Sequence, residues 1–122
     1  MGVVGIGGLF FRSDDPQALQ AWYREHLGVG GNPDTGEWFW QQQAGPTVFA
    51  PFKRGSDYFP ADKAWMLNLR VHGLDALLSR LRADGIAVET RAEWDDPQTG
   101  RFARIHDPET NPVELWEPPP GA

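Results

Sequence analysis

Hydrophobic and polar positions follow two different periods along this chain, and their order predicts its elements. Two segments carry apolar residues three, four and seven or eight positions apart, which is the spacing of an amphipathic helix with one buried face. These segments are "DPQALQAWYREHLGV" (residues 15–29) and "GLDALLSRLRADGIAV" (residues 73–88). Asp15, which precedes a proline, suits a helix N-cap. Gly28 and Gly85 suit the left-handed residues that end helices.

Short apolar runs typical of strands flank both predicted helices. They are "VVGIGGLFF", "EWFWQQQ" and "TVFAPF" around the first helix, and "AWMLNLRV", "IAVETRAEW", "RFARIH" and "VELWE" around the second. The chain thus repeats the order strand, helix, strands. Residues 1–52 and 64–118 are the two predicted modules, and residues 53–63, rich in Gly, Pro and charge, are the predicted connector. Because neither module has enough apolar surface to fold alone, we expect a single domain over residues 1–122.

Composition excludes several classes of function. The formal charge of −6 disfavours a nucleic-acid partner, and the absence of cysteine excludes disulfides and thiolate metal sites. No apolar run approaches the roughly 20 residues that span a membrane, and no signal pattern opens the chain. We therefore expect a cytoplasmic protein with no membrane partner. Six tryptophans and seven phenylalanines exceed what a small core needs, and such aromatics often line a small-molecule site.

Three segments, in this order, resemble the vicinal oxygen chelate superfamily, which includes glyoxalases, bleomycin resistance proteins and extradiol dioxygenases. They are "GLFFRSDDPQALQAWYREHLGV", "LNLRVHGLDALLSRLRADGIAV" and "FARIHDPETNPVELWEP". The last is the most specific, because it is similar to the family's Asp-Pro-x-x-Asn turn followed by a strand that bears a glutamate. The resemblance implies an α+β fold, in which two βαβββ modules form a curved mixed sheet around a cleft. It also implies a homodimer, which often builds the cleft across its interface.

The resemblance carries over only part of a metal site. Metal enzymes of this family hold a divalent ion with two histidines and one glutamate. Glu114 matches the glutamate, but Gly8 and Met66 stand at the histidine positions. Glycine offers no ligand, a thioether is a poor ligand for a hard ion, and one carboxylate cannot replace a set of three. We therefore expect no metal of the family type, and the cofactor, if any, stays unidentified.

Alternation along the last two strands predicts a catalytic pair. If Ala103 and Ile105 face the helices, every second side chain on the other side faces the cleft. That set is Phe102, Arg104, His106, Glu114 and Trp116. Glu114 and His106 flank one hairpin turn, so they are the candidate catalytic residues, as acid and base or as a cation site. The alternative is a simple cross-strand hydrogen bond between them at the rim of the cleft.

The same rule supplies further ligand-binding candidates from the other strands. Burying Arg70 beneath a helix would be very costly, which fixes the register of its strand. The candidates are Phe10, Arg12, Met66, Asn68 and Arg70. In residues 37–43, either Trp38 and Trp40 or Phe39 and Gln41 point inward. The two tryptophans make the better binding wall.

Three functions are compatible with this cleft. Aromatic walls with arginines suit a partly aromatic or anionic ligand, so the first hypothesis is a small-molecule-binding protein that works without the family's metal. The alternative is a glyoxalase-like lyase or isomerase that uses a non-standard metal site or the pair of Glu114 and His106. A third is a non-catalytic dimeric interaction module, with the aromatics at its interface. The residues leave open whether the protein is an enzyme.

Overall fold

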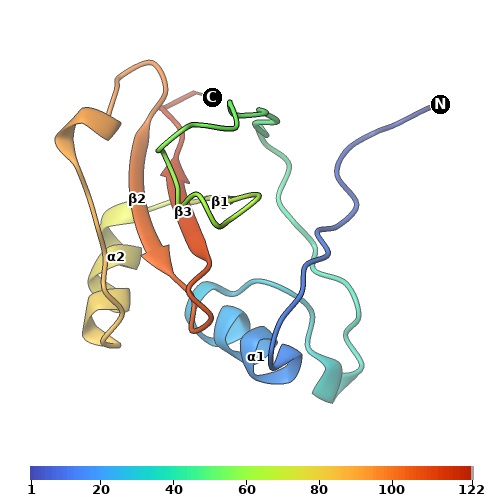
Figure 1. Ribbon diagram of the computed structural model, residues 1–122. Coiled ribbons are helices and arrows are strands. Elements are labelled where there is room, and N and C mark those ends of the chain that lie inside the picture. Colours follow the sequence, from blue (N-terminus) through green and yellow to red (C-terminus); the bar gives the residue numbers. More distant parts are fainter. Residues whose placement is uncertain (122) are drawn as a thin grey trace.

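The computed structural model describes residues 1–121, whose regular elements form an α+β fold (Figure 1). The elements are α1 (Pro16–Leu27), η1 (Pro33–Thr35), β1 (Leu67–Arg70), α2 (Leu74–Ala83), η2 (Ala92–Trp94), β2 (Arg101–His106) and β3 (Pro112–Glu117). The strands form one mixed sheet in the order β1-β3-β2. Strand β3 runs parallel to β1 and antiparallel to β2, so both of its edges are hydrogen-bonded.

Both helices end as their glycines predict. The side chain of Asp15 accepts a hydrogen bond from the N–H of Ala18 at 3.1 Å, and Gly28 closes α1 in the left-handed conformation with φ 66°. Gly85 follows α2 with φ 81°. A residue without Cβ takes this conformation at little cost, which is why glycine ends both patterns.

Two glutamates near the C-terminal hairpin stabilise the helix N-termini. Glu117 of β3 accepts hydrogen bonds from the N–H groups of Gly73 and Leu74 at 3.0 and 3.3 Å, at the start of α2. Glu109, between β2 and β3, accepts from the hydroxyl of Ser13 at 2.6 Å and from the N–H of Asp14 at 2.8 Å, just before α1. Helix N-termini favour such negative groups because their first N–H groups lack partners within the helix.

The turn between β2 and β3 is organised by Asp107, which is buried. Its Oδ1 accepts the N–H groups of Glu109 and Asn111 at 2.9 and 3.0 Å, and its Oδ2 accepts the side-chain amide of Asn111 at 2.9 Å. The hydroxyl of Tyr23 on α1 donates to the same Oδ2 at 2.7 Å. Because both oxygens have partners, the carboxylate is stable in the interior. The Asp-Pro-x-x-Asn segment therefore forms a defined turn and ties α1 to the sheet.

The core lies between the two helices and one face of the sheet. Ala103, Ile105, Val113 and Leu115 of β2 and β3 are all 0% exposed. They pack against Leu19, Tyr23, Leu74, Leu78 and Leu81 of the helices. The predicted alternation of these two strands is thereby confirmed, since their apolar side chains face the helices and the intervening ones face away. Each fully buried aliphatic side chain contributes roughly 1.5–3 kcal/mol.

The N-terminal half differs from the prediction. Strands were expected in residues 3–11, 37–43 and 47–52, but the described residues have no strand before β1. These segments run along the side of the sheet opposite α2 (Figure 1). Large apolar side chains there are open to solvent, such as Phe10 at 96% and Phe49 at 86% exposed. A strand exists only when a neighbour takes its backbone hydrogen bonds, and within this one chain these segments have no such neighbour.

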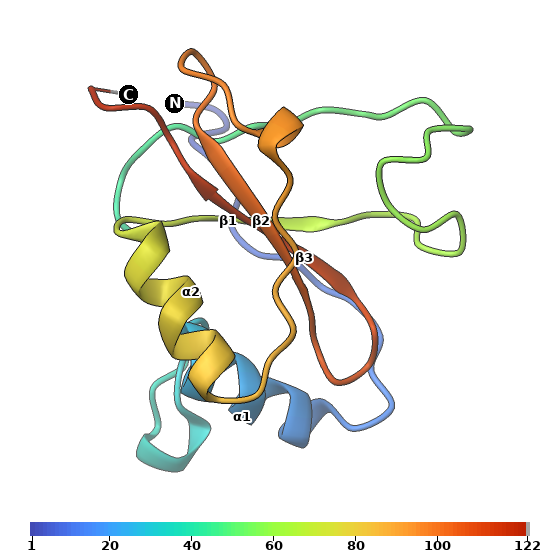
Figure 2. The same ribbon diagram turned by 90° about the vertical axis from the view of Figure 1, so that its left-hand side faces the viewer.

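The strand predicted at residues 86–94 is also wrong in part. Only Glu89 forms a bridge, in which its N–H and C=O pair with Arg104 at 2.8 Å each. The chain then turns through η2, which places Trp94 beside β2 (Figure 2). No helix within residues 1–121 has the length and apolarity needed to cross a membrane.

Candidate functional site

The face of the sheet that points away from the helices gathers six of the predicted site residues. In the register of the sheet, Glu114 on β3 lies between Asn68 on β1 and Arg104 on β2, and Trp116 lies between Arg70 and Phe102. We call this surface the Glu114 face. It consists of Asn68, Arg70, Phe102, Arg104, Glu114 and Trp116. Their coming together follows from strand pairing, because residues opposite one another on neighbouring strands share a face.

Glu114 is buried, and both of its carboxylate oxygens are hydrogen-bonded. It is 7% exposed. The side-chain amide of Asn68 donates to Oε1 at 2.7 Å, and the phenol of Tyr58 donates to Oε2. These two donors compensate for the lost hydration of a charged group. Glu114 is therefore part of a buried polar network and not a residue on a wet surface.

Tyr58 is a site residue that the sequence did not reveal. It lies in the connector, 56 positions from Glu114 along the chain. Burial, and next the hydrogen bond to Glu114, raise the pKa of Tyr58 to about 12, although the charge of Arg104 acts in the opposite direction. The phenol therefore stays protonated at neutral pH and acts as a donor. Its only sequence signal was an amphipathic aromatic within a Gly- and Pro-rich segment.

Arg104 lies under two aromatic rings with an incomplete set of contacts. It is 8% exposed, and its Cζ lies 5.0 Å from the ring centre of Tyr58 and 5.3 Å from that of Trp94. Both distances are in the range of cation–π contacts. Its Nε and Nη2 are buried and have no hydrogen-bond partner within residues 1–121. Trp94 is a second contact that the sequence missed, because η2 stands where a strand was predicted.

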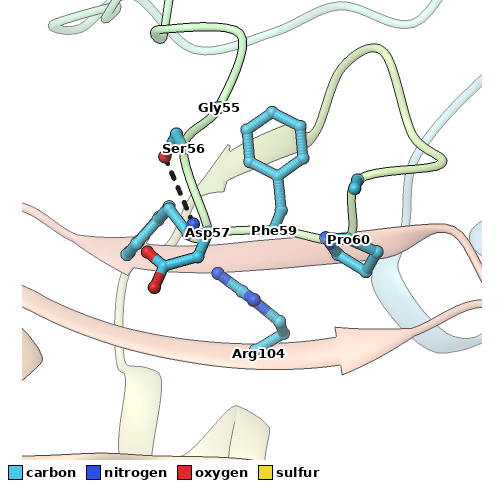
Figure 3. Close-up of a pocket in the computed structure, with 8 residues that line it drawn as sticks. Gly55, Ser56, Asp57, Phe59, Pro60 and Arg104 are labelled. Atoms are coloured by element: carbon cyan, nitrogen blue, oxygen red, sulfur yellow. Dashed lines mark hydrogen bonds between the residues drawn. The ribbon is translucent and has the colours of Figure 1, made fainter.

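A hollow of about 450 Å³ opens between Arg104 and the connector (Figure 3). Residues 55–61 form its wall, and Arg104 is the residue of the sheet that lines it. In Figure 3 the Arg104 side chain rises from β2 toward the stretch of connector that carries Asp57. Small-molecule sites commonly have volumes of about 300–1,000 Å³, so the hollow is large enough for a small ligand.

Arg70 has a different environment, although it lies on the same face. Its guanidinium donates to the carbonyls of Gln43 and Pro46 at 2.6 and 2.5 Å. Gly45 lies so close that a Cβ there would come within 2.7 Å of Arg70 Nε. Arg70 therefore holds the segment around residue 45 against β1, and its donors are already used.

Phe102 and Trp116 provide the aromatic part of the Glu114 face. Their rings are nearly parallel, at 10°, with centroids 6.4 Å apart. The indole N–H of Trp116 donates to the carbonyl of Thr99 at 2.7 Å, which fixes its orientation. Met66, directly before β1, is half-buried. That these side chains contact a ligand is still a prediction.

The remaining ligand-binding candidates do not reach this face. Phe10 is 96%, Trp38 84% and Trp40 41% exposed, and all lie in the N-terminal half, as does the exposed Arg12. An edge contact with a ring centroid distance of 5.2 Å joins the neighbouring Phe11 to Trp65. The lining predicted from two modules is thus assembled from one module only in the single chain.

The geometry also separates the predicted catalytic pair. His106 is exposed and lies opposite Pro112, whereas Arg104 is the residue opposite Glu114. No hydrogen bond joins His106 to Glu114 among the described residues, and the donors to Glu114 are Tyr58 and Asn68 instead. The turn fixed by Asp107 sets this register. A catalytic role for either residue stays a prediction.

The residues at the family's metal position do not fit a metal ion. Gly8 has no side chain, Met66 offers a thioether, and both oxygens of Glu114 accept hydrogen bonds. Within residues 1–121, no three histidine, aspartate or glutamate side chains gather in one place that could hold an ion. We therefore derive no chemistry through a metal.

Comparison with known proteins identifies relatives of the whole chain. The family model for the glyoxalase-like domain matches residues 8–116. Among solved structures, the chain is similar to TnmS3, an antibiotic binding protein from Streptomyces sp. CB03234, with 25% sequence identity and a TM-score of 0.57. That similarity covers 97% of this chain and 98% of the other. No curated protein matches the chain significantly.

Proposed function

Since the chain belongs to the glyoxalase-like domain family, as its sequence resemblance predicted, we propose that it binds a small organic molecule on the Glu114 face. The observation that carries the proposal is the buried polar network of Glu114, Asn68 and Tyr58 beside Arg104 and a hollow of about 450 Å³. Buried polar groups at a hollow with aromatic neighbours are typical of a binding site. The similarity to an antibiotic binding protein supports a ligand of that kind, partly aromatic and carrying polar or anionic groups.

Binding without a metal is the second part of this proposal. It is supported by Gly8 and Met66 at the family's ligand positions and by the two hydrogen bonds that Glu114 accepts. The enzymatic alternative, a lyase or isomerase, has no equivalent support, because His106 lies away from Glu114 in the register of the hairpin.

A thermal-shift screen of aromatic antibiotics and metabolites tests binding and metal dependence together. A ligand at 100 times its Kd stabilises the folded protein by about 2.7 kcal/mol, and we expect this shift to be the same in EDTA and in added Zn²⁺, Ni²⁺ or Mn²⁺. The same compounds are followed for turnover by mass spectrometry. Stabilisation that requires a metal, or conversion of a bound compound that is lost in Glu114→Gln, would replace this proposal by the enzymatic one.

We further propose that the protein is a homodimer in which the N-terminal segments form the strands of the first βαβββ module. The support is physical. Val4, Phe10 and Phe49 are 86–97% exposed, and leaving so many large apolar groups in water is unfavourable. Strand β1 is an edge of the sheet, so its outer backbone groups are open to a further strand. A second copy supplies both the strand partners and the apolar cover.

Sedimentation velocity over a range of concentrations tests the dimer. We expect the native chain to sediment as a dimer and Phe49→Asp to shift it toward a monomer, because a charge in an apolar interface is costly. Ser79→Asp adds the same charge at an exposed position of α2 and serves as the control. A native chain that stays monomeric at tens of micromolar would exclude the dimer and, with it, the proposed first module.

A further inference from the structure

Arg104 is the charged group of the Glu114 face whose contacts are least complete. It is 8% exposed, and two of its guanidinium nitrogens, Nε and Nη2, have no hydrogen-bond partner within residues 1–121. From this geometry we propose that Arg104 anchors the acidic group of an aromatic carboxylate. This inference rests on the proposed function, and it names the chemistry that the ligand must carry.

The two free nitrogens are the reason for choosing a carboxylate. The N–H bonds of Nε and Nη2 point in the same direction along one edge of the planar guanidinium. A planar group with two oxygens accepts both bonds at once, which is the fork geometry that arginine forms with carboxylates. A neutral amide offers only one oxygen acceptor, so the two chemistries are expected to differ in affinity.

No acidic side chain of the chain itself takes this position. Glu114 lies opposite Arg104 in the sheet, but Tyr58 and Asn68 occupy its two oxygens. Asp57 lines the same hollow, yet the ion pairs among residues 1–121 include none between Asp57 and Arg104. The rings of Tyr58 and Trp94 therefore provide the main compensation for this buried charge.

Other arginines of the region have their partners in place. Arg70 donates to two backbone carbonyls, at 2.5 and 2.6 Å. Arg101, which lies two residues before Ala103 on β2, pairs with Asp75 at 2.8 Å and lies 3.6 Å from Glu117. This contrast singles out Arg104, because an incoming anion there does not have to break an existing ion pair or carbonyl contact.

The cover over Arg104 explains why the ligand is aromatic. Tyr58 lies on the guanidinium and comes from the connector, whose regular structure is limited to turns. A ligand that reaches Nε and Nη2 must displace this ring. An aromatic acid then replaces the ring contact that it removes, because its own ring stacks on the guanidinium or on Trp94, while its carboxylate takes the two free N–H groups.

Calorimetric titration with 2-naphthoate and its neutral analogue 2-naphthamide tests the proposal. We expect the native protein to bind the carboxylate about tenfold or more tightly than the amide, a difference suited to one charge-assisted pair of hydrogen bonds. In Arg104→Met the carboxylate should fall to the level of the amide. In Arg104→Lys, which keeps the charge but loses the fork, most of the preference should be lost. Arg82→Met, on the exposed surface of α2, is the matched control and should behave as the native protein.

A stability measurement separates this role from a structural one. Removing a buried charge that lacks hydrogen-bond partners should leave the Tm of unliganded Arg104→Met equal to or above the native value. Equal affinities of the two probes for the native protein, or a preference that survives in Arg104→Met or Arg104→Lys, would overturn the proposal. If neutral aromatic ligands bind while 2-naphthoate does not, the anchor is wrong and the proposed function stands. If no compound of the screen binds, both fall.

Discussion

Residues 64–118 and residues 1–52 carry similar hydrophobic patterns, yet they bury their apolar side chains very differently. In the C-terminal part, Ile105, Val113 and Leu115 are 0% exposed beneath the two helices. In the N-terminal part, Val4 is 97% and Phe49 86% exposed. Only helix α1, which packs on the C-terminal core, buries its apolar face in the N-terminal part.

The difference teaches that the partner of a strand matters as much as its pattern. Strand β3 pairs with β1 on one edge and with β2 on the other, so its backbone is satisfied and its apolar face is covered. The N-terminal segments have comparable apolar residues but no such neighbours in the single chain. Amphipathic strands are stable only within a sheet that covers one face, so their pattern describes a surface that awaits a partner.

The strongest test of this comparison is a truncation in each half. Leu115→Ala should lower the free energy of unfolding by about 2–5 kcal/mol, because it leaves a cavity at a position that is 0% exposed. Phe49→Ala should change the stability of the dilute, single chain by less than about 0.5 kcal/mol, since this ring is already exposed. Urea unfolding followed by circular dichroism measures both. Equal losses in a dilute sample would show that Phe49 is buried within its own chain.

A smaller effect is expected where the two halves are joined. Tyr23→Phe removes the hydroxyl that donates to Asp107 at 2.7 Å and should cost about 1–3 kcal/mol at neutral pH. Burial and this hydrogen bond raise the pKa of Tyr23 above its ordinary value of 10. The folded state therefore keeps a proton that the unfolded chain loses above pH 10, and this contribution to stability falls as the pH rises further.

Unfolding midpoints of native protein and Tyr23→Phe should accordingly converge above pH 10. The control is Tyr58→Phe, which removes a tyrosine whose folded pKa is about 12 but which lies at the Glu114 face and not at the junction with α1. For that variant the difference from the native protein should narrow between pH 10 and 12. A constant difference for Tyr23→Phe across this range would contradict the assigned hydrogen bond.

The smallest effect concerns the link between Glu109 and the start of α1. The hydroxyl of Ser13, and next the N–H of Asp14, lower the pKa of the Glu109 carboxyl. Its stabilising effect is therefore present above the ordinary carboxyl pKa and is lost as the pH falls through the lower folded value. Glu109→Gln should have a slightly lower Tm than the native protein at pH 7 and nearly the same Tm at about pH 3. Glu37→Gln, an exposed control without this link, should show no such pH dependence.

The sequence predicted those features that depend on neighbouring residues. Asp15 and Gly28 mark the ends of α1, and alternation gave the buried and open faces of β2 and β3. Asp107 was recognised within a turn motif, and its side chain makes that turn through short-range hydrogen bonds. These interactions span a few positions, so local patterns record them.

Contacts of the site over long sequence distances could not be predicted in the same way. Tyr58 meets Glu114 because the connector folds back over the sheet, and no periodicity encodes that path. His106 was paired with Glu114 from their places around the turn. The register set by the hairpin puts Arg104 opposite Glu114 instead, and a shift of one pair along a hairpin changes every cross-strand neighbour.

By itself, the sequence determined the family, the two helices, the alternation of the C-terminal strands and the position of Glu114 among them. Only the tertiary structure decided what Glu114 and Arg104 contact. Tyr58 and Asn68 complete the hydrogen bonds of Glu114, whereas Arg104 keeps two buried N–H groups without a partner. The physical reason is that helix caps and strand faces follow from local geometry, while the hydrogen bonds of a buried charge depend on every segment that folds over it.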